Sequence, residues 1–460
     1  SRFDDHVRET LPWYDLATHG VAHFLRAYVP EGGLVYDVGA STGNVARSVA
    51  ETIESRSLRF VGIEPSKQMV DIYDAPGEIV QALDAATGEL LWEYRRERPR
   101  STVGRASRAG QQHRNLAIYQ DKIYLNTTDA HVVAIDTGSG LGVWDRNVGG
   151  DSGYEYTSGA IIADGKIVSG LTGCERYRDD TCYIVALDAN TGQELWRTST
   201  VARPGERGGD TWGDLPVMFR AGSDAWIPGS YDPRSSTLFF GTAQAKPWAR
   251  SVRGTDGAAL YTNSTLALDP TTGEIKWFFQ HLPGDSHDMD EVFERILVDY
   301  DDRQSVFTMG KIAVLWELDR ETGEFRAAHD LGYQTLVDID PVSGLATYRE
   351  GTLQEIGEEI HWCPSTAGFK SWRAMSYYPE LETFFIPINL NCETAVFGPV
   401  DRVAGGGFDR RRTIPRFEGF DPRRLVRRRK QHFVARAQDT GLDPPGDDAP
   451  GVEFIDVLHR

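Results

Sequence analysis

Two carboxylates stand two residues apart in the segment GDSHDMDEV, at Asp288 and Asp290. Side chains two apart on a strand or an extended loop share a face, so both carboxylates can point at one ion. Oxygen ligands of this kind suit a hard cation such as Ca²⁺. The pair therefore predicts a metal site. The alternative is that Asp290 faces solvent or forms a salt bridge, because the surrounding stretch is generally acidic.

The chain has four cysteines, and none of them forms a CxxC motif, which argues against a zinc or thioredoxin-like site. Cys174 and Cys182 bracket a short polar loop, GCERYRDDTCY, that could close as a disulfide across a hairpin. Such a bridge would suit an oxidising compartment. The alternative is a pair of separate, reduced thiols.

A third pattern lies near the start of the chain, where VYDVGASTGN places Asp37, Gly39 and Gly43 in a strand-to-helix turn and Glu64 ends the next strand. It resembles the start of class I S-adenosylmethionine-dependent methyltransferases. There the glycine turn lets the backbone approach the methionine portion, and the acid accepts bonds from ribose hydroxyls. Ser41 stands where that family usually has its middle glycine.

The elements that must position the central residues come from an internal repeat, Asp-x₃-Gly-x₃-Trp. Its glycines at 88, 140, 192, 273 and 323 lie 52, 52, 81 and 50 residues apart, and the fifth copy lacks the Trp. The motif predicts a β-hairpin in which Asp accepts backbone bonds, Gly supplies a positive φ and Trp packs between neighbouring sheets. With the preceding hairpins, each step makes a four-stranded propeller blade. A β-solenoid is the alternative, but its rungs are usually shorter.

The stretch from about 74 to 400 resembles the β-propeller of the pyrroloquinoline quinone (PQQ) dependent, or quinoprotein, alcohol dehydrogenases. The resemblance rests on RNLAIY, YTSGA, LTGCE, DAWIPGSYDP, FFGTAQAKPW, GDSHDMDEV and TMGKIAVLWELDR, which occur in the family's order. It implies that six residues contact the cofactor: Arg114, Thr157, Thr172, Gly173, Cys174 and Trp226. For Trp226 the alternative is interblade packing.

The same resemblance implies a catalytic and metal-binding set. Asp288 matches the catalytic acid, and Lys311 stands where the family has a Lys or Arg beside the reactive carbonyl. The implied metal ligands are Glu175, Gln244, Asp288 and Asp290, although the family has an asparagine where Gln244 stands. Lanthanide-type members carry an aspartate at the position of Asp290, so the resemblance implies a lanthanide ion in preference to Ca²⁺.

The chain departs from the family in two respects. Arg108 and Ala109 stand where an adjacent cysteine pair is expected, and the match fades after SYYPELETFFIPINL. The expected fold is therefore mainly β, an eight-bladed quinoprotein propeller with blades missing. We expect a methyltransferase-like, Rossmann-like α/β fragment at 1–73, the propeller at 74–400 and a basic, Pro/Gly/Asp-rich tail at 401–460.

These observations predict an oxidoreductase that oxidises an alcohol or aldehyde by hydride transfer to metal-bound PQQ. One alternative is an inactive, composite or truncated propeller that acts as a binding or structural module, and another is a methyltransferase. The expected partners are a small alcohol and an electron acceptor such as a cytochrome c. A net charge of −19 argues against nucleic acid, except through the basic tail. No apolar run reaches membrane-spanning length and no leader is present, and the expected location is the periplasm.

Overall fold

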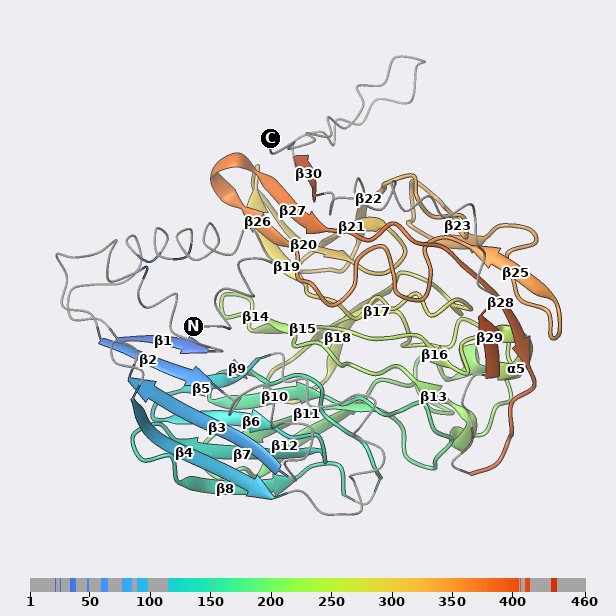
Figure 1. Ribbon diagram of the computed structural model, residues 1–460. Coiled ribbons are helices and arrows are strands. Elements are labelled where there is room, and N and C mark those ends of the chain that lie inside the picture. The colour runs from blue at the N-terminus through green and yellow to red at the C-terminus, as the bar shows by residue number, and fades with distance from the viewer. Residues whose placement is uncertain are drawn as a thin grey trace, which may run out of the picture. The chain divides into compact units, whose positions relative to one another are not determined.

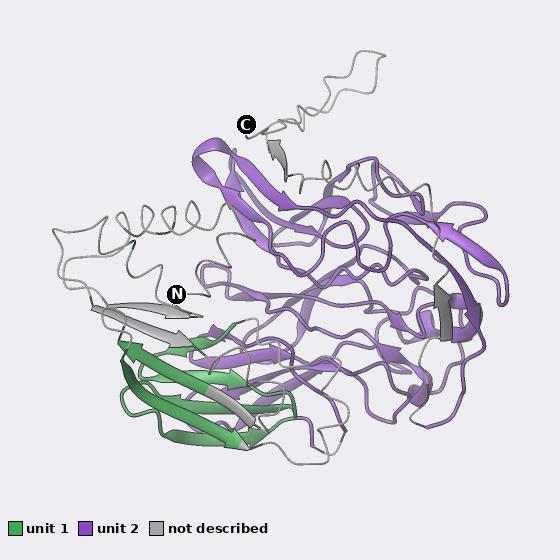
Figure 2. Cartoon of the chain, in the orientation of Figure 1, with its two compact units in different colours: residues 1–148 green, residues 149–460 purple. Residues whose placement is uncertain are grey.

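The computed structural model of the 460-residue chain describes residues 115–150 and 152–404 continuously. Outside these ranges it describes strand segments at 34–38, 59–64, 77–84, 89–97, 410–413 and 432–436, and the single positions 21, 25, 48 and 406. Arg108, Ala109 and Arg114, the glycine turn that follows Asp37, and most of the tail lie outside the described residues. The chain divides into two compact units, 1–148 and 149–460, which are coloured separately in Figure 2.

Four sheets of four antiparallel strands follow the chain order, as the repeat predicts (Figure 1). The first lies in unit 1 and the other three lie in unit 2. Their strands are β5 (Ala117–Tyr119), β6 (Lys122–Asn126), β7 (His131–Asp136) and β8 (Gly142–Asn147); β9 (Ile161–Ala163), β10 (Lys166–Gly170), β11 (Tyr183–Asp188) and β12 (Glu194–Ser199); β14 (Ser230–Asp232), β15 (Thr237–Gly241), β17 (Ser264–Leu268) and β18 (Ile275–Gln280); and β19 (Ile296–Tyr300), β20 (Arg303–Met309), β21 (Val314–Asp319) and β22 (Phe325–Asp330).

A further four-stranded sheet in unit 1 joins the N-terminal segment to the first repeat. Its order is β1 (Leu34–Val38), β2 (Arg59–Glu64), β3 (Gly77–Asp84) and β4 (Leu90–Glu97). β1 and β2 are parallel, whereas β2 and β3 are antiparallel. The parallel pair fits the expected βαβ start. The sheet nevertheless runs on across the sequence boundary that we expected near residue 73.

The Asp–Gly turn of the repeat is stabilised by hydrogen bonds between residues of the turn itself. At Asp188, Oδ1 accepts the backbone N–H groups of Asn190 (3.0 Å) and Thr191 (2.9 Å), and Gly192 has a φ of 68°. A sixth copy of this turn, from Asp340 to Gly344, joins β23 (Val337–Ile339) to β24 (Ala346–Tyr348). The sequence analysis missed it because its hairpin lacks the Trp and follows the fifth copy by much less than a blade.

The Trp of the repeat packs over the turn of the next sheet. Trp196 on β12 donates its indole N–H to the Pro270 carbonyl at 3.0 Å. A Cβ on Gly273 would lie 2.4 Å from the Trp196 ring, and one on Gly323 would lie 2.4 Å from the Trp277 ring. The prediction that these Trp side chains pack between neighbouring sheets is confirmed for these two residues.

We expect Gly273→Ala to lower the free energy of unfolding by about 2–4 kcal/mol, because the new methyl group must displace the Trp196 ring and the position has a positive φ. Gly351→Ala is the matched control, since Gly351 has nearly the same φ (74°) but nothing within 4 Å of a new Cβ. The control should cost about 1 kcal/mol. Thermal and urea unfolding of the two variants test this. Equal losses would show that packing over the turn contributes nothing.

After β22 the four-stranded pattern ends within the described residues, and the sheets have two or three strands. β28 (Glu393–Gly398) pairs with β25 (Glu359–Trp362) and β29 (Arg410–Thr413), and β27 (Thr383–Pro387) pairs with β26 (Ser376–Tyr378) and β30 (His432–Arg436). A disulfide joins Cys363 and Cys392, a pairing that the sequence analysis did not make. Among the described residues no helix is both long and apolar enough to cross a membrane.

Candidate active site

The predicted site residues of unit 2 lie in loop segments that run side by side. In the segment around β13 (Ala221–Gly222), the N–H of Gly222 donates to the Cys174 carbonyl (2.8 Å) and the N–H of Ser223 donates to the Gln244 carbonyl (3.0 Å). Beyond Gln244, the N–H of Lys311 donates to the Asp290 carbonyl at 3.0 Å. Each of these bonds joins segments that lie 21 to 48 positions apart in the sequence.

Two acids, an amide and a lysine converge in this region. The Lys311 ammonium lies 2.8 Å from Asp290 Oδ2 and 3.3 Å from Asp288 Oδ2. Gln244, which is 2% exposed, donates its backbone N–H to Asp290 Oδ1 (3.2 Å) and its side-chain amide to Asp288. Both Asp288 and Asp290 therefore have a carboxylate oxygen within 3.3 Å of the Lys311 ammonium. Asp290 does form a salt bridge, but at 5% exposure it does not face solvent.

Burial and neighbouring charges shift the pKa values of Asp288 and Lys311. Burial raises the pKa of Asp288 to about 6, and the Lys311 charge opposes that rise. Burial alone would lower the pKa of Lys311, but Asp288 and Asp290 outweigh it and the pKa is raised. A carboxyl with such a pKa can accept a proton near neutral pH, as a general base requires.

On the other side of the Ser223 segment lies the LTGCE stretch. Cys174 and Cys182 form a disulfide with their Cα atoms 5.5 Å apart, which confirms the predicted bridge. The N–H of Cys174 donates to Asp224 Oδ1 at 3.0 Å, and Glu175 follows directly. Burial raises the pKa of Asp224 to about 7, and the charge of Glu175 adds to that effect.

Trp226 borders the same segments. Its ring is partly exposed and packs edge-to-face against Phe293, with ring centroids 5.3 Å apart. The Ser158 hydroxyl, next to Thr157, donates to the Trp226 carbonyl at 2.9 Å. Thr172 and Gly173 lie one segment away, where the backbone of Thr172 pairs with Glu155. The structure therefore places YTSGA, LTGCE and the tryptophan next to one another.

Three charged features escaped the sequence analysis. Asp224 lies between the Glu175 and Gln244 segments. The Lys246 charge opposes the rise in the pKa of Asp224 that burial causes. A buried acid and a buried base also lie at the end of the GDSHDMDEV segment and just after it, where Glu291 and Arg295 are 0% and 2% exposed. The signals were available, because Asp224 stands two residues before Trp226 and Lys246 stands two after Gln244.

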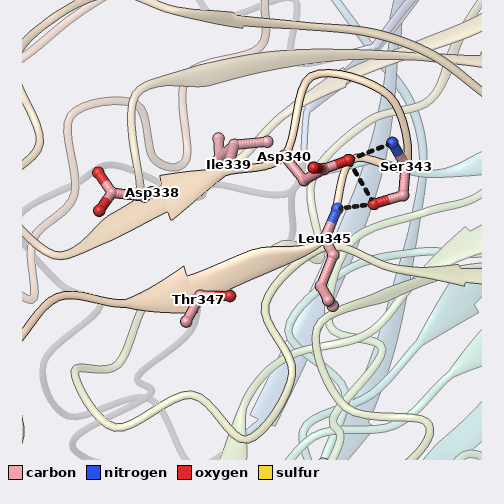
Figure 3. A pocket seen from close by; sticks show the side chains of 6 residues that line it. All are labelled: Asp338, Ile339, Asp340, Ser343, Leu345 and Thr347. Atoms are coloured by element: carbon pink, nitrogen blue, oxygen red, sulfur yellow. Dashed lines mark hydrogen bonds between the residues drawn. The ribbon is translucent and has the colours of Figure 1, made fainter.

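A separate pocket of about 440 Å³ lies on the β23–β24 hairpin (Figure 3). Its lining residues are Asp338, Ile339, Asp340, Ser343, Leu345 and Thr347. The Asp340 carboxylate already accepts the N–H of Ser343 (2.7 Å) and its hydroxyl (2.8 Å), so it serves the turn. None of the predicted site residues lines this pocket.

The donor set fits a hard cation beside an anionic, planar cofactor. Glu175, Asp288 and Asp290 supply carboxylate oxygens and Gln244 supplies an amide oxygen, which are the ligands that such ions take. Lys311 supplies a nearly buried positive charge. Trp226 supplies a partly exposed aromatic ring.

Comparison with known proteins agrees with this geometry. The family model described as "PQQ: Glucose/ethanol/alcohol dehydrogenase, beta-propeller domain" matches residues 67–325, which is more than half of the chain. The chain belongs to this family of quinoprotein β-propellers. The match ends at Phe325, the first residue of β22.

Individual relatives match about two thirds of the chain. The quinohemoprotein alcohol dehydrogenase ADH IIB of Pseudomonas putida is 31% identical over 325 residues, which cover 67% of this chain and 46% of the relative. The quinoprotein alcohol dehydrogenase PedH of Pseudomonas putida is 30% identical over 339 residues, with coverages of 67% and 56%. The chain thus spans about half the length of the curated relatives that it matches.

Solved structures show the same fold. A quinohemoprotein alcohol dehydrogenase from Comamonas testosteroni matches with a TM-score of 0.62 and 25% identity, over 70% of this chain and 50% of that one. A europium-containing methanol dehydrogenase matches with a TM-score of 0.70 over 78% of this chain and 66% of that one. At 21% identity, the second likeness concerns the fold alone.

Proposed function

We propose that the chain is an oxidoreductase that oxidises an alcohol or an aldehyde by hydride transfer to metal-bound PQQ. The observation that carries the proposal is that Lys311 pairs with both Asp288 and Asp290, while Gln244 donates hydrogen bonds to the same two carboxylates. When bound, PQQ would supply the acceptor for the hydride of the alcohol carbon, which carries both electrons of the oxidation. The relatives named above are alcohol dehydrogenases, which supports the same reaction class.

Each residue of the cluster has a role in this proposal. Asp288 takes the hydroxyl proton of the alcohol, so that loss of a proton and a hydride leaves the carbonyl product. Lys311 stabilises negative charge that develops beside it. Glu175, Gln244, Asp288 and Asp290 hold the ion, a lanthanide or Ca²⁺.

The remaining contacts orient the cofactor. We propose that the planar face of Trp226 stacks on the cofactor. We propose that four residues contact the edge of the cofactor: Thr157, Thr172, Gly173 and Cys174. Arg114, which lies outside the described residues, stays a predicted contact. The domain boundaries at 73 and 400, a small-alcohol substrate, a cytochrome c acceptor and a periplasmic location are part of the same proposal.

Reconstitution tests the proposal. With PQQ and either La³⁺ or Ca²⁺, the purified chain should reduce an artificial dye in the presence of a primary alcohol, and omission of PQQ or of the ion should abolish the reaction. Binding of PQQ without turnover would favour the alternative, a propeller that serves as a binding or structural module. Micromolar S-adenosylmethionine binding that is lost in Gly39→Val would instead favour the methyltransferase alternative, which none of the comparisons above supports.

A further inference from the structure

Asp224 holds the middle position in the row of site segments, although the sequence analysis singled out only Trp226 from the DAWIPGSYDP motif that Asp224 begins. On one side, the N–H of Ala225 donates to the Leu171 carbonyl (3.0 Å) and the N–H of Cys174 donates to Asp224 Oδ1 (3.0 Å). On the other side, the N–H of Ala243 donates to the Asp224 carbonyl (2.8 Å). Asp224 therefore lies between the segment that carries Glu175 and the segment that carries Gln244.

The environment of Asp224 differs from that of the other acids of the cluster. It is 4% exposed, and its carboxylate receives one hydrogen bond, from the Cys174 N–H. Asp288 and Asp290 have the Lys311 ammonium within 3.3 Å, whereas the ion pairs of the described residues include none to Asp224. The Lys246 charge acts on Asp224 only from beyond ion-pair distance. A buried carboxylate without an ion-pair partner is costly unless a cation or a proton compensates it.

We propose that Asp224 is a fifth protein ligand of the ion, contributed by the segment between those of Glu175 and Gln244. The inference rests on the proposed function, because it concerns the same ion. With Asp224, carboxylates come from three segments: 175, 224, and the 288–290 loop. The added negative charge favours a trivalent ion over a divalent ion by Coulomb attraction at short range.

A purely structural role for Asp224 makes a different prediction. Asp224→Asn keeps an oxygen that can accept the Cys174 N–H, so the local backbone contact survives while the charge is lost. If Asp224 only positioned the Cys174–Glu175 backbone, this variant would behave as the wild type. Asp224→Glu keeps the charge and serves as the second variant. Asp338→Asn, at a side chain that is 74% exposed, is the matched surface control.

Terbium luminescence, excited through nearby tryptophans, tests the proposal on the full chain with and without PQQ. Lifetimes in H₂O and D₂O count the waters bound to the ion, because O–H groups quench Tb³⁺. We expect Asp224→Asn to weaken Tb³⁺ binding by about tenfold or more and to add about one bound water. Competing Ca²⁺ should lose less affinity. Asp224→Glu and Asp338→Asn should bind Tb³⁺ nearly as the wild type does.

The outcomes separate the two proposals. Unchanged affinity and unchanged hydration in a folded Asp224→Asn protein would overturn the role of Asp224, and so would weaker binding with no added water. Folding is checked by circular dichroism and thermal unfolding. Tb³⁺ binding that depends on Asp224 in a chain that never binds PQQ would uphold this inference and contradict the proposed function. A wild-type chain that binds neither Tb³⁺ nor Ca²⁺ under any condition would overturn both.

Discussion

Asp288→Asn is expected to lower the rate of PQQ-dependent alcohol oxidation by about a thousandfold or more, because general-base catalysis contributes about 10²–10⁴-fold and the amide cannot take the proton. The substitution preserves the shape of the side chain and an oxygen that can accept the Gln244 amide. Stopped-assay dye reduction at saturating PQQ, ion and alcohol measures the effect.

Two control measurements accompany this experiment. Because Asp288 is also a proposed ligand, the metal content of the variant must be determined, and the loss should persist at ion concentrations that restore occupancy. Asp338→Asn should retain the wild-type rate, since Asp338 is exposed and pairs with Arg349 at 2.8 Å. An Asp288→Asn enzyme with the wild-type rate would remove Asp288 from the reaction.

The second large effect concerns the choice of ion. If the cofactor site assembles, La³⁺ or Ce³⁺ should support faster dye reduction than Ca²⁺, and Asp290→Ala should lose the lanthanide activity preferentially, by about tenfold or more. A trivalent ion has one more charge to neutralise than Ca²⁺. Asp290 supplies that charge at 5% exposure, where solvent screening is weak.

Asp290 also lies 2.8 Å from the Lys311 ammonium. Removal of its carboxylate therefore changes the charge next to the proposed ion and next to Lys311. Asp290→Asn is therefore the better matched variant, because it keeps an acceptor for the Gln244 N–H. Equal responses of the wild type and both variants to La³⁺ and Ca²⁺ would contradict the role of Asp290. The Ca²⁺ activity serves as the internal control for folding.

The parts of the fold that the sequence predicted depend on short-range interactions. The Asp188 turn forms through bonds to the next three residues, so its motif is readable at any position in the chain. The pairing of β2 with β3 has no such local signal, because it joins segments of different character. The continuous sheet of β1, β2, β3 and β4 could therefore not be predicted from residue patterns alone.

Some residues of the site could likewise be predicted from the sequence, and others could not. The convergence of Asp288 and Asp290 follows from their spacing, and Lys311 and Gln244 came from the family resemblance. Asp224 begins the DAWIPGSYDP motif, but the motif assigned it no role, since its importance comes from neighbours that are 50 residues before it and 19 residues after it. Only the backbone contacts of the folded chain place it between Glu175 and Gln244.

The most direct test of the central claim is a spectroscopic titration of the purified chain with PQQ in the presence of La³⁺. The account predicts saturable binding of about one PQQ per chain, with a shifted quinone absorbance that depends on the ion and is weakened in Glu175→Gln, which removes a proposed ligand. A folded wild-type chain that leaves the absorbance of free PQQ unchanged, with La³⁺ and with Ca²⁺, would contradict it.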